Sequence, residues 1–368
     1  MLAGLRAAAW EWVRMPARWR YRRELVARTF SLPSGEPMLS YGGALPREPG
    51  AMVAGGRVKL RALDRAFPEG GAFNVLYLVS SAAPRHAVEL VRWAKSRGVK
   101  FIWNQNGVAF PAWAGDRLAE TNGPMAALRA EADFVVNQSE FCRVSAEQFL
   151  GPSSVPSRVL FNPVDLAEFS PAPARGPVEC WNLLTAGTHY QAARVLTPLA
   201  ALRHLRDAGC PARLTIAGAL RWANAEVEVR EEISRLDLGD TVTLRPAFSQ
   251  SEAVELYRAA HVLLHPKYAD PCPTVVIEAL ACGLPVIGSA TGGLPELVGE
   301  DGGELIEVPE SWDRAAFPTG EQFADAAMKV ILNWPVRSKA ARARAERLFD
   351  AERWVAEHRV IFREVLEL

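Results

Sequence analysis

Short apolar runs bounded by turn residues alternate along this chain with longer segments whose apolar residues recur every three to four positions. The short runs predict buried strands, and the longer segments predict amphipathic helices. In the first half, strands are expected at 37–41, 74–80, 100–104, 133–136 and 158–161. Helices are expected at 55–67, 85–96, 125–131 and 140–150. This alternation is typical of a parallel sheet covered by helices.

The second half repeats the pattern. Strands are expected at 181–186, 212–217, 242–245, 262–265 and 286–288. Helices are expected at 196–208, 226–236, 251–260, 275–282, 321–333 and 351–366. Both halves therefore indicate doubly wound α/β lobes, joined near the sequence FNPVD and a proline-rich linker at 171–177. Two such lobes place a ligand-binding cleft between the carboxyl ends of their strands.

Composition narrows the class of protein. The 368 residues suit two domains, and the hydrophobic fraction of 49% with 23% charged residues is that of a globular protein. Lysine plus arginine and aspartate plus glutamate both number 42, which argues against nucleic acid as a partner. The five scattered cysteines form no C-x-x-C pair and favour a reducing cytoplasm. No run of eighteen apolar residues predicts a membrane-spanning helix.

The N-terminal segment 1–35 is rich in arginine and tryptophan. It carries seven arginines against two glutamates up to position 30, with three tryptophans interleaved. Arginine with tryptophan is the composition of a helix lying on anionic lipid, whereas a solvated helix packed on the first lobe is the alternative. Glu11 and Arg14 interrupt the apolar stretch that a signal peptide requires.

The segment from Tyr268 to Val298, YADPCPTVVIEALACGLPVIGSATGGLPELV, carries the candidate chemistry. A strand is expected to end at His265, a loop to carry Asp270, and a helix to start near Thr274 with Glu278 one turn further on the same face. Unpaired N–H groups and the dipole at a helix start bind anions and sugar hydroxyls. Gly292-Gly293 predicts a second backbone cradle. The segment therefore predicts a site for a polyhydroxylated ligand that bears a phosphate.

Four motifs and their order along the chain resemble those of the retaining glycosyltransferases of family 4, which have the GT-B fold. Seven residues separate Asp270 from Glu278, as in the family's E-x₇-E region, and a T-G-G-x-P-E-L-V ending follows. ADFVVNQSEFCR at 132–143, FNPVDLAEFSP at 161–171 and ARLTIAGA at 212–219 match its supporting motifs. The helix at 349–366 is similar to the one that crosses back to the first lobe. Jointly these motifs are specific, whereas each alone is weak.

The resemblance implies a domain division and a set of site residues. The division is a basic helix at 1–35, an acceptor-side lobe at 36–163, a nucleotide-sugar lobe at 164–348 and a crossover helix at 349–368. Glu278 would bind the ribose, Asp270 would lie by the sugar ring, and Gly42-Gly43 would approach the diphosphate. The other donor-binding positions are Gly187, His189, Gly218, Phe248, Cys272, Pro273, Thr274 and Val275.

Two departures from the family pattern bear on activity. The family holds the leaving diphosphate with an arginine and a lysine, but Thr188 and Ala193 stand at those places here. A leaving diphosphate requires cations or helix ends where no metal is present, so Arg194, His189 and Lys267 are the candidate replacements. The family often has a histidine after the third strand, whereas this chain has Asn104 and Asn106. An amide donates hydrogen bonds but is no general base.

These observations predict a metal-independent, retaining glycosyltransferase with Asp270, Glu278, Asn106, Lys267 and Arg194 at its catalytic centre. Its partners would be a nucleotide sugar and a glycan or lipid-linked acceptor, in bacterial surface polysaccharide or glycoconjugate synthesis, with no cofactor and no nucleic acid. The protein would be cytoplasmic and peripheral on the inner face of the membrane. The missing clamp leaves an inactive binding or scaffold protein as an alternative, and a GT-B-fold sugar-nucleotide epimerase or hydrolase as another.

Overall fold

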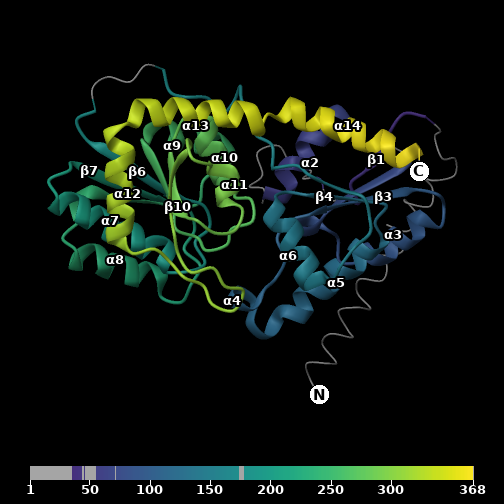
Figure 1. Cartoon of the computed structure of the whole chain (residues 1–368), viewed down its shortest axis with the longest axis horizontal. Coiled ribbons are helices and arrows are strands. Elements are labelled where there is room, and N and C mark those ends of the chain that lie inside the picture. Colours follow the sequence, from purple (N-terminus) through teal and green to yellow (C-terminus); the bar gives the residue numbers. More distant parts are fainter. Residues whose placement is uncertain (1–34, 44, 46–54, 71, 174–177, 368) are drawn as a thin grey trace.

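The structure is a computed structural model that describes residues 35–43, 45, 55–70, 72–173 and 178–367. The segment 1–35 predicted as a basic helix lies outside the described residues, apart from residue 35. Two parallel sheets with helices on both faces form two lobes that lie side by side in Figure 1. The expected α/β architecture of two lobes is therefore confirmed.

The first lobe holds a five-stranded sheet in the order β1-β2-β3-β4-β5. Its strands are β1 (Leu39–Ser40), β2 (Val75–Val79), β3 (Lys100–Gln105), β4 (Phe134–Asn137) and β5 (Ser157–Val159). One face packs on α2 (Gly55–Ala66) and α14 (Ala351–Glu367). The other face packs on α3 (Ala87–Lys95) and α5 (Leu118–Glu131). The short helix α4 (Pro111–Ala114) and α6 (Glu140–Leu150) complete this lobe together with the 3-10 turns η1 (Ser80–Ala82) and η2 (Gly115–Arg117).

The second lobe holds a six-stranded sheet in the order β11-β10-β9-β6-β7-β8. Its strands are β6 (Trp181–Ala186), β7 (Ala212–Ala217), β8 (Val242–Arg245), β9 (Val262–His265), β10 (Val286–Ser289) and β11 (Gly303–Ile306). The order reverses between β6 and β9, which pair directly. Open parallel sheets bind ligands at such a reversal, outside the carboxyl ends of the two strands.

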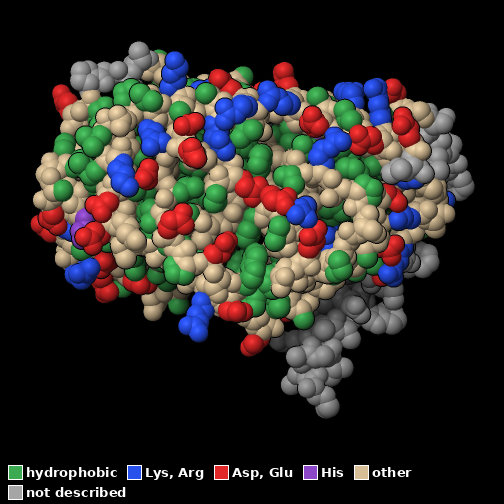
Figure 2. All heavy atoms as spheres, in the orientation of Figure 1, with side chains coloured by type: hydrophobic (Ala, Val, Ile, Leu, Met, Phe, Trp, Pro, Cys, Tyr) green, Lys and Arg blue, Asp and Glu red, His purple; other side chains and the backbone are tan. Residues whose placement is uncertain are grey.

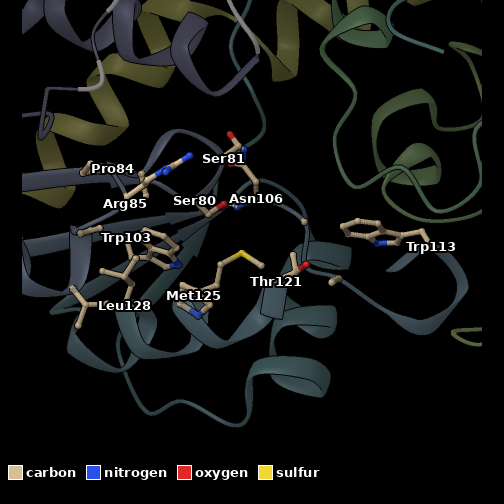
Figure 3. Close-up of a pocket in the computed structure, with 16 residues that line it drawn as sticks. Ser80, Ser81, Pro84, Arg85, Trp103, Asn106, Trp113, Thr121, Met125 and Leu128 are labelled. Atoms are coloured by element: carbon tan, nitrogen blue, oxygen red, sulfur yellow. Dashed lines mark hydrogen bonds between the residues drawn. The ribbon is translucent and has the colours of Figure 1, made fainter. Parts of the chain in front are cut away.

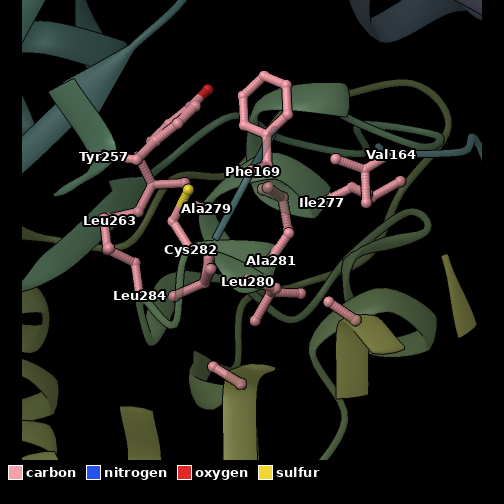
Figure 4. Close-up of a cluster of buried hydrophobic side chains, with 14 of the residues drawn as sticks. Val164, Phe169, Tyr257, Leu263, Ile277, Ala279, Leu280, Ala281, Cys282 and Leu284 are labelled. Carbon is pink, nitrogen blue, oxygen red and sulfur yellow. The ribbon is translucent and has the colours of Figure 1, made fainter. Parts of the chain in front are cut away.

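The helices of the second lobe enclose its sheet. They are α7 (Ala193–Asp207), α8 (Ala225–Arg235), α9 (Gln250–Ala259), α10 (Thr274–Ala281), α11 (Leu294–Val298), α12 (Gly320–Leu332) and α13 (Trp334–Leu348), with the 3-10 turn η3 (Gly239–Thr241). Figure 4 shows Tyr257 of α9 and Leu263 of β9 beside the α10 side chains Ala279 and Leu280. Full burial of each large apolar side chain contributes about 1.5–3 kcal/mol, so this cluster fixes α10 firmly against the sheet.

The C-terminal helices run along both lobes, as the yellow ribbon in Figure 1 shows. Val164 and Asp350 form a parallel bridge where the chain passes between the lobes. From there α14 places Trp354, Ile361 and Phe362 in the core of the first lobe. The predicted helix that crosses back to the first lobe is confirmed.

The arginine- and lysine-rich segment 336–347 is only partly exposed to solvent. This segment lies in α13, where Ala341 and Ala345 are fully buried beside α10 because their small side chains allow close approach. Arg342 donates to the carbonyl oxygens of Phe169 and Ala281. On the face shown in Figure 2, acidic and basic side chains are interspersed, with no large area of one sign. That surface fits the balanced net charge.

Candidate active site

The loops after β6 and β9 lie side by side because these strands pair in the second sheet. The loop after β9 leads into α10, whose first residue follows Pro273. Among the described residues, the N–H groups of Thr274 and Val275 have no hydrogen-bond partner. These free donors and the positive end of the helix dipole form an anion-binding start of α10, as the sequence predicted.

Asp270 lies beside Lys267 of the same loop and beside His265, the last residue of β9. Its Oδ2 lies 3.0 Å from Nζ of Lys267 and 3.1 Å from Nε2 of His265. Burial alone would raise the pKa of Asp270, but Lys267 and His265 hold it well below its usual range. Asp270 is therefore a buried carboxylate that stays ionised at neutral pH.

Arg194 supplies a buried cation on the neighbouring loop. It lies in the first turn of α7, and its Nη1 donates to the carbonyl oxygen of Thr188. Within the described residues its Nε has no partner. Its Nη2 and a methyl group of Val275 are the atoms nearest to Gly187 on the side where a Cβ would stand. The structure thus places a guanidinium between the β6 loop and the start of α10, one position after the Ala193 of the missing clamp.

His189 does not supply a second cation there. The ring is fully buried, and its Nε2 lies 3.2 Å from the carbonyl oxygen of Ala217. Burial and the nearby Arg194 lower its pKa to about 4, so the ring is neutral at physiological pH. The role of His189 at the diphosphate therefore stays a prediction, in which a neutral ring would act through a hydrogen bond and not through its charge.

Glycines bring the ends of β6 and β7 together. Gly187 and Gly218 both have positive φ, at 110° and 121°. A Cβ on Gly218 would stand 1.9 Å from the carbonyl oxygen of Gly187, so no side chain fits at position 218. In the first lobe, a Cβ on Gly42 would stand 2.7 Å from Leu78, which makes this glycine a packing requirement. Gly43 is exposed beside it.

Glu278 faces α9 from the buried side of α10. The hydroxyl of Tyr257 donates to its Oε2 at 2.8 Å. Burial raises the pKa of Glu278 to about 7, although this hydrogen bond acts in the opposite direction. Glu278 therefore changes its protonation near neutral pH and has one oxygen without a hydrogen bond from the described residues.

Gly293 does not offer its N–H group to the second backbone cradle that the sequence predicted. The N–H of Gly293 donates to the carbonyl oxygen of Asp270 at 2.9 Å, so it is not available to a ligand. A Cβ on Gly293 would stand 2.0 Å from the carbonyl oxygen of Pro271. This turn therefore packs against the backbone of the Asp270 loop and holds it in place.

The remaining predicted positions have mainly structural contacts. Phe248 packs against the buried cluster of the second lobe. Cys272 is buried, and its carbonyl oxygen accepts a hydrogen bond from Nδ2 of Asn162 at 2.9 Å. Pro273 has no N–H and stands at the N-cap position of α10.

A pocket of about 490 Å³ lies in the first lobe at the carboxyl ends of β2 and β3. Figure 3 shows the side chains of Trp103, Met125 and Leu128 on one side of it and those of Ser81 and Asn106 on another. The other lining residues are Ser80, Ala83, Pro84, Arg85, Ala87, Val88, Gly107, Ala109, Trp113, Thr121 and Pro124. The pocket reaches the boundary between the lobes, because a Cβ on its Gly107 would stand 2.6 Å from the Pro271 ring of the Asp270 loop.

Asn106 is held firmly at the edge of this pocket. Its Nδ2 donates to the hydroxyl of Ser81 at 2.7 Å, and its backbone N–H donates to that of Ser80 at 3.0 Å. Its Oδ1 accepts from the buried Lys59 at 2.8 Å. The structure thus brings Asn106 close to the site, but its amide is already committed to protein partners.

Two further contacts tie the lobes together. The carboxylate of Glu296 on α11 accepts hydrogen bonds from the N–H groups of Glu140 and Phe141 at the start of α6. Trp312 of the second lobe stacks on Phe141, with ring centroids 5.4 Å apart. These contacts fix the first-lobe pocket beside the second-lobe loops.

Sequence reasoning missed three participants. His265 was read only as a strand end, and Tyr257 only as a helix residue. Lys59 had a readable signal, because it shares a helical face with Leu63 and Phe67, both in the core. A lysine on an apolar face requires a polar partner in the interior.

The fold and site define an α/β protein of the GT-B class. Residues 183–345 match the family described as Glycosyl transferases group 1. Most of the second lobe thus matches the model of that family, and the two described lobes have the GT-B fold, which agrees with the resemblance in the sequence motifs.

Sequence relatives agree with this assignment. The D-inositol 3-phosphate glycosyltransferase of Kineococcus radiotolerans is 29% identical over 234 residues, which cover 55% of this chain and 50% of the relative. The enzyme of the same name from Pseudarthrobacter chlorophenolicus is 34% identical over 144 residues, or 37% of this chain and 34% of the relative. The matched segments thus span half or less of these relatives.

Solved structures share the fold across both lobes. Anabaena HepE in complex with UDP has a TM-score of 0.64 at 15% identity, covering 84% of this chain and 82% of HepE. Sucrose-phosphate synthase from Thermosynechococcus elongatus has a TM-score of 0.65 at 17% identity, covering 90% of this chain and 88% of the synthase. At these identities the likeness establishes the fold alone.

Proposed function

We propose that this protein transfers a sugar from a nucleotide-sugar donor to a hydroxyl group of an acceptor. The observation that carries the proposal is the meeting of Arg194, Lys267 and the free start of α10 around the ionised Asp270. Cations and helix N–H groups bind a diphosphate, and a carboxylate accepts hydrogen bonds from sugar hydroxyls. All of these groups lie within the segment that matches the glycosyltransferase family.

A uridine diphosphate sugar is the first donor to test. HepE was solved with UDP and also with UDP-glucose, and it shares the fold of both lobes. Glu278 would accept hydrogen bonds from the ribose hydroxyls through its uncommitted oxygen. The acceptor would enter the first-lobe pocket, whose apolar wall and serine hydroxyls suit an amphipathic, hydroxyl-bearing molecule.

The chemistry follows from these positions. The bond between the anomeric carbon and the diphosphate oxygen breaks, and the acceptor oxygen forms the new bond to that carbon. Arg194, Lys267 and the start of α10 stabilise the negative charge of the leaving diphosphate, while Asp270 stabilises positive charge on the sugar ring. The leaving phosphate oxygen takes the acceptor proton on the same face, which retains the anomeric configuration. Proton NMR of the product tests retention.

Arg194 also bears on the inactive scaffold alternative. That reading was motivated by the absence of the family's clamp at Thr188 and Ala193. A buried guanidinium beside Gly187 offers the same charge from the next position along the chain. Sugar transfer is therefore the function that the geometry supports best.

A nucleotide panel followed by transfer assays tests the proposal. Thermal unfolding with UDP, GDP, ADP and CDP should show one nucleotide that raises the melting temperature. Its sugar forms should then support transfer to a hydroxyl acceptor. Nucleotide binding without turnover would support the scaffold reading, and donor turnover without acceptor would support a hydrolase or epimerase.

Nucleotide affinity should fall as the pH drops through about 7, because the ribose hydroxyls require Glu278 in its ionised form. From pH 8 to pH 6 the ionised fraction falls roughly tenfold, and the binding constant should follow. Titration calorimetry measures this, with Glu278→Gln as the matched variant. That variant should bind more weakly and keep only the pH dependence of the phosphate itself. If nucleotide affinity depended on pH equally in both proteins, Glu278 would not bind the ribose.

Activity should survive EDTA, since the proposed mechanism assigns the role of a cation to Arg194 and Lys267. Within the described part of the chain, no group of three or more His, Cys, Asp or Glu side chains is arranged to hold a metal ion. The measurement is turnover before and after chelation. Loss of activity that manganese or magnesium restores would contradict the prediction.

We also propose that the acceptor is a glycan or a lipid-linked sugar of bacterial surface polysaccharide synthesis, reached at the inner face of the membrane. None of the helices in the described ranges is long and apolar enough to cross a membrane. The arginine and tryptophan content of 1–35 supports peripheral contact. The full chain should co-sediment with anionic vesicles and not with neutral ones, and equal binding to both would contradict this.

A further inference from the structure

A buried lysine stands where the two lobes meet. Lys59 on α2 is only 2% exposed. Its Nζ lies 2.6 Å from Oδ1 of Asn104, 2.8 Å from Oδ1 of Asn106, 3.1 Å from Oδ1 of Asn162 and 3.4 Å from Oε1 of Gln138. Four side-chain amides, from three loops and a strand, therefore converge on one ammonium group.

The charge of Lys59 is held by amide dipoles alone. Among the described residues, no carboxylate forms an ion pair with it. Burial lowers its pKa to about 8, against the opposing effect of the Cys272 and Cys142 thiols. An ammonium group donates hydrogen bonds and never accepts them, so each amide must turn its oxygen towards Lys59 and its NH₂ group away.

The amides that Lys59 orients reach both halves of the site. Asn106 turns its Nδ2 to Ser81 in the first-lobe pocket, at 2.7 Å. Asn162, in the segment between the lobes, turns its Nδ2 to the carbonyl oxygen of Cys272, at 2.9 Å. Cys272 lies two residues before the start of α10, where the donor phosphates would bind.

The same lysine also connects to the crossover helix. Nδ2 of Asn104 donates to the hydroxyl of Tyr77 at 2.7 Å, and this hydroxyl lies 2.9 Å from Nε2 of His358 on α14. The buried chain of hydrogen bonds thus runs from the second-lobe loop, through Lys59, to α14, which packs on the same face of the first sheet as α2. The Lys59 ammonium group keeps these amides in a single orientation, because each must present its oxygen to the same donor.

We propose that Lys59 is a positioning residue that sets the geometry of both the acceptor pocket and the donor loop. It fixes the Asn106 amide in the pocket and, through Asn162, fixes the Cys272 carbonyl that precedes α10. Without the ammonium group, the amide oxygens would face one another, and rotation of Asn106 and Asn162 would relieve the repulsion. Both ends of the site would then lose their alignment together.

Hydrogen exchange in the full chain tests this inference without any enzymatic assay. In Lys59→Met, which removes the donors but keeps an unbranched side chain, backbone amides at 104–109 and at 276–278, the first hydrogen-bonded amides of α10, should exchange at least about tenfold faster. Lys95→Met is the matched control, because Lys95 pairs with Asp133 away from the site. Unchanged exchange at both segments overturns the proposal, and so does an equal increase throughout the chain.

A second variant keeps the test decisive if Lys59→Met does not fold. Asn162→Ala cuts only the link between Lys59 and Cys272. It should speed exchange at 276–278 and leave 104–109 unchanged. Faster exchange at both segments, or at neither, contradicts the proposed route.

A second test, a double-mutant cycle of KM values, rests on the proposed function. Asn106→Ala should raise the KM of the acceptor, Asn162→Ala should raise that of the donor, and Lys59→Met should raise both, each by about tenfold. The double variant Lys59→Met/Asn162→Ala should show no further rise in the donor KM, because both changes break one pathway. A donor KM in the double variant that rises by the product of the two single effects would overturn the proposal. If the wild type transfers no sugar, the proposed function fails, whereas the exchange result still decides the role of Lys59.

Discussion

Replacing Arg194 with methionine should lower turnover by roughly a hundredfold or more, because loss of one preorganised group at a developing negative charge costs about 2.7–4 kcal/mol. The melting temperature should change little. The guanidinium is buried, and burial lowers its pKa, so the free enzyme gains little from holding this charge. Steady-state kinetics with a saturating donor, together with thermal unfolding, measures both effects.

The matched control for this prediction lies on the same helix. Arg203 of α7 is solvent-facing and pairs with Asp207 four residues later. Arg203→Met should leave turnover unchanged. If Arg194→Met also keeps wild-type turnover, Lys267→Met and the double variant decide whether Lys267 alone supplies the charge. Full activity in the double variant would remove both cations from the mechanism.

Asp270→Asn should lower turnover by about a hundredfold to a thousandfold while nucleotide binding is largely kept. The substitution preserves the shape of the side chain but removes the negative charge that would stabilise the positively charged sugar ring in the transition state. Free UDP lacks the sugar, so its affinity should hardly change. Comparison of kcat with the dissociation constant of UDP separates the two effects.

Asp207→Asn is the corresponding control, since Asp207 is an exposed carboxylate on α7. Its substitution should leave kcat at the wild-type value. An Asp270→Asn protein with normal kcat would show that the carboxylate merely anchors Lys267 and His265. Strongly weakened UDP binding would instead show that Asp270 holds Lys267 in place for the diphosphate, because removing a negative charge beside a diphosphate would by itself strengthen binding.

The sequence predicted the bounds of four second-lobe strands correctly. The bounds of β6, β7, β8 and β9 agree with the predicted ranges, and those of α6 do too. Each of these strands is a run rich in branched apolar residues between turn residues, so the local pattern and the fold agree. The placement of Asp270 beside α10 followed from the same pattern.

Other elements depend on contacts that a sequence pattern does not reveal. β11 has the sequence GELI, and its Gly303 is required because a Cβ there would stand 1.8 Å from the carbonyl oxygen of Val286. The orientation of Glu278 towards Tyr257 and the role of Gly293 as a support likewise arise from neighbours distant in sequence. Residue types identified the candidates, but only tertiary packing decides which groups remain free for a ligand.

The helix α14 has a consequence for how the chain is made. A ribosome synthesises the first lobe's five strands first, yet Trp354, Ile361, Phe362 and Val365 of that lobe's core emerge last. During elongation at about 5–20 residues per second, the face of the first sheet that α14 covers stays open for the synthesis of the entire second lobe. Nascent chains should therefore complete the second lobe's core before that of the first, and premature termination within α14 should leave apolar core residues of the first lobe exposed.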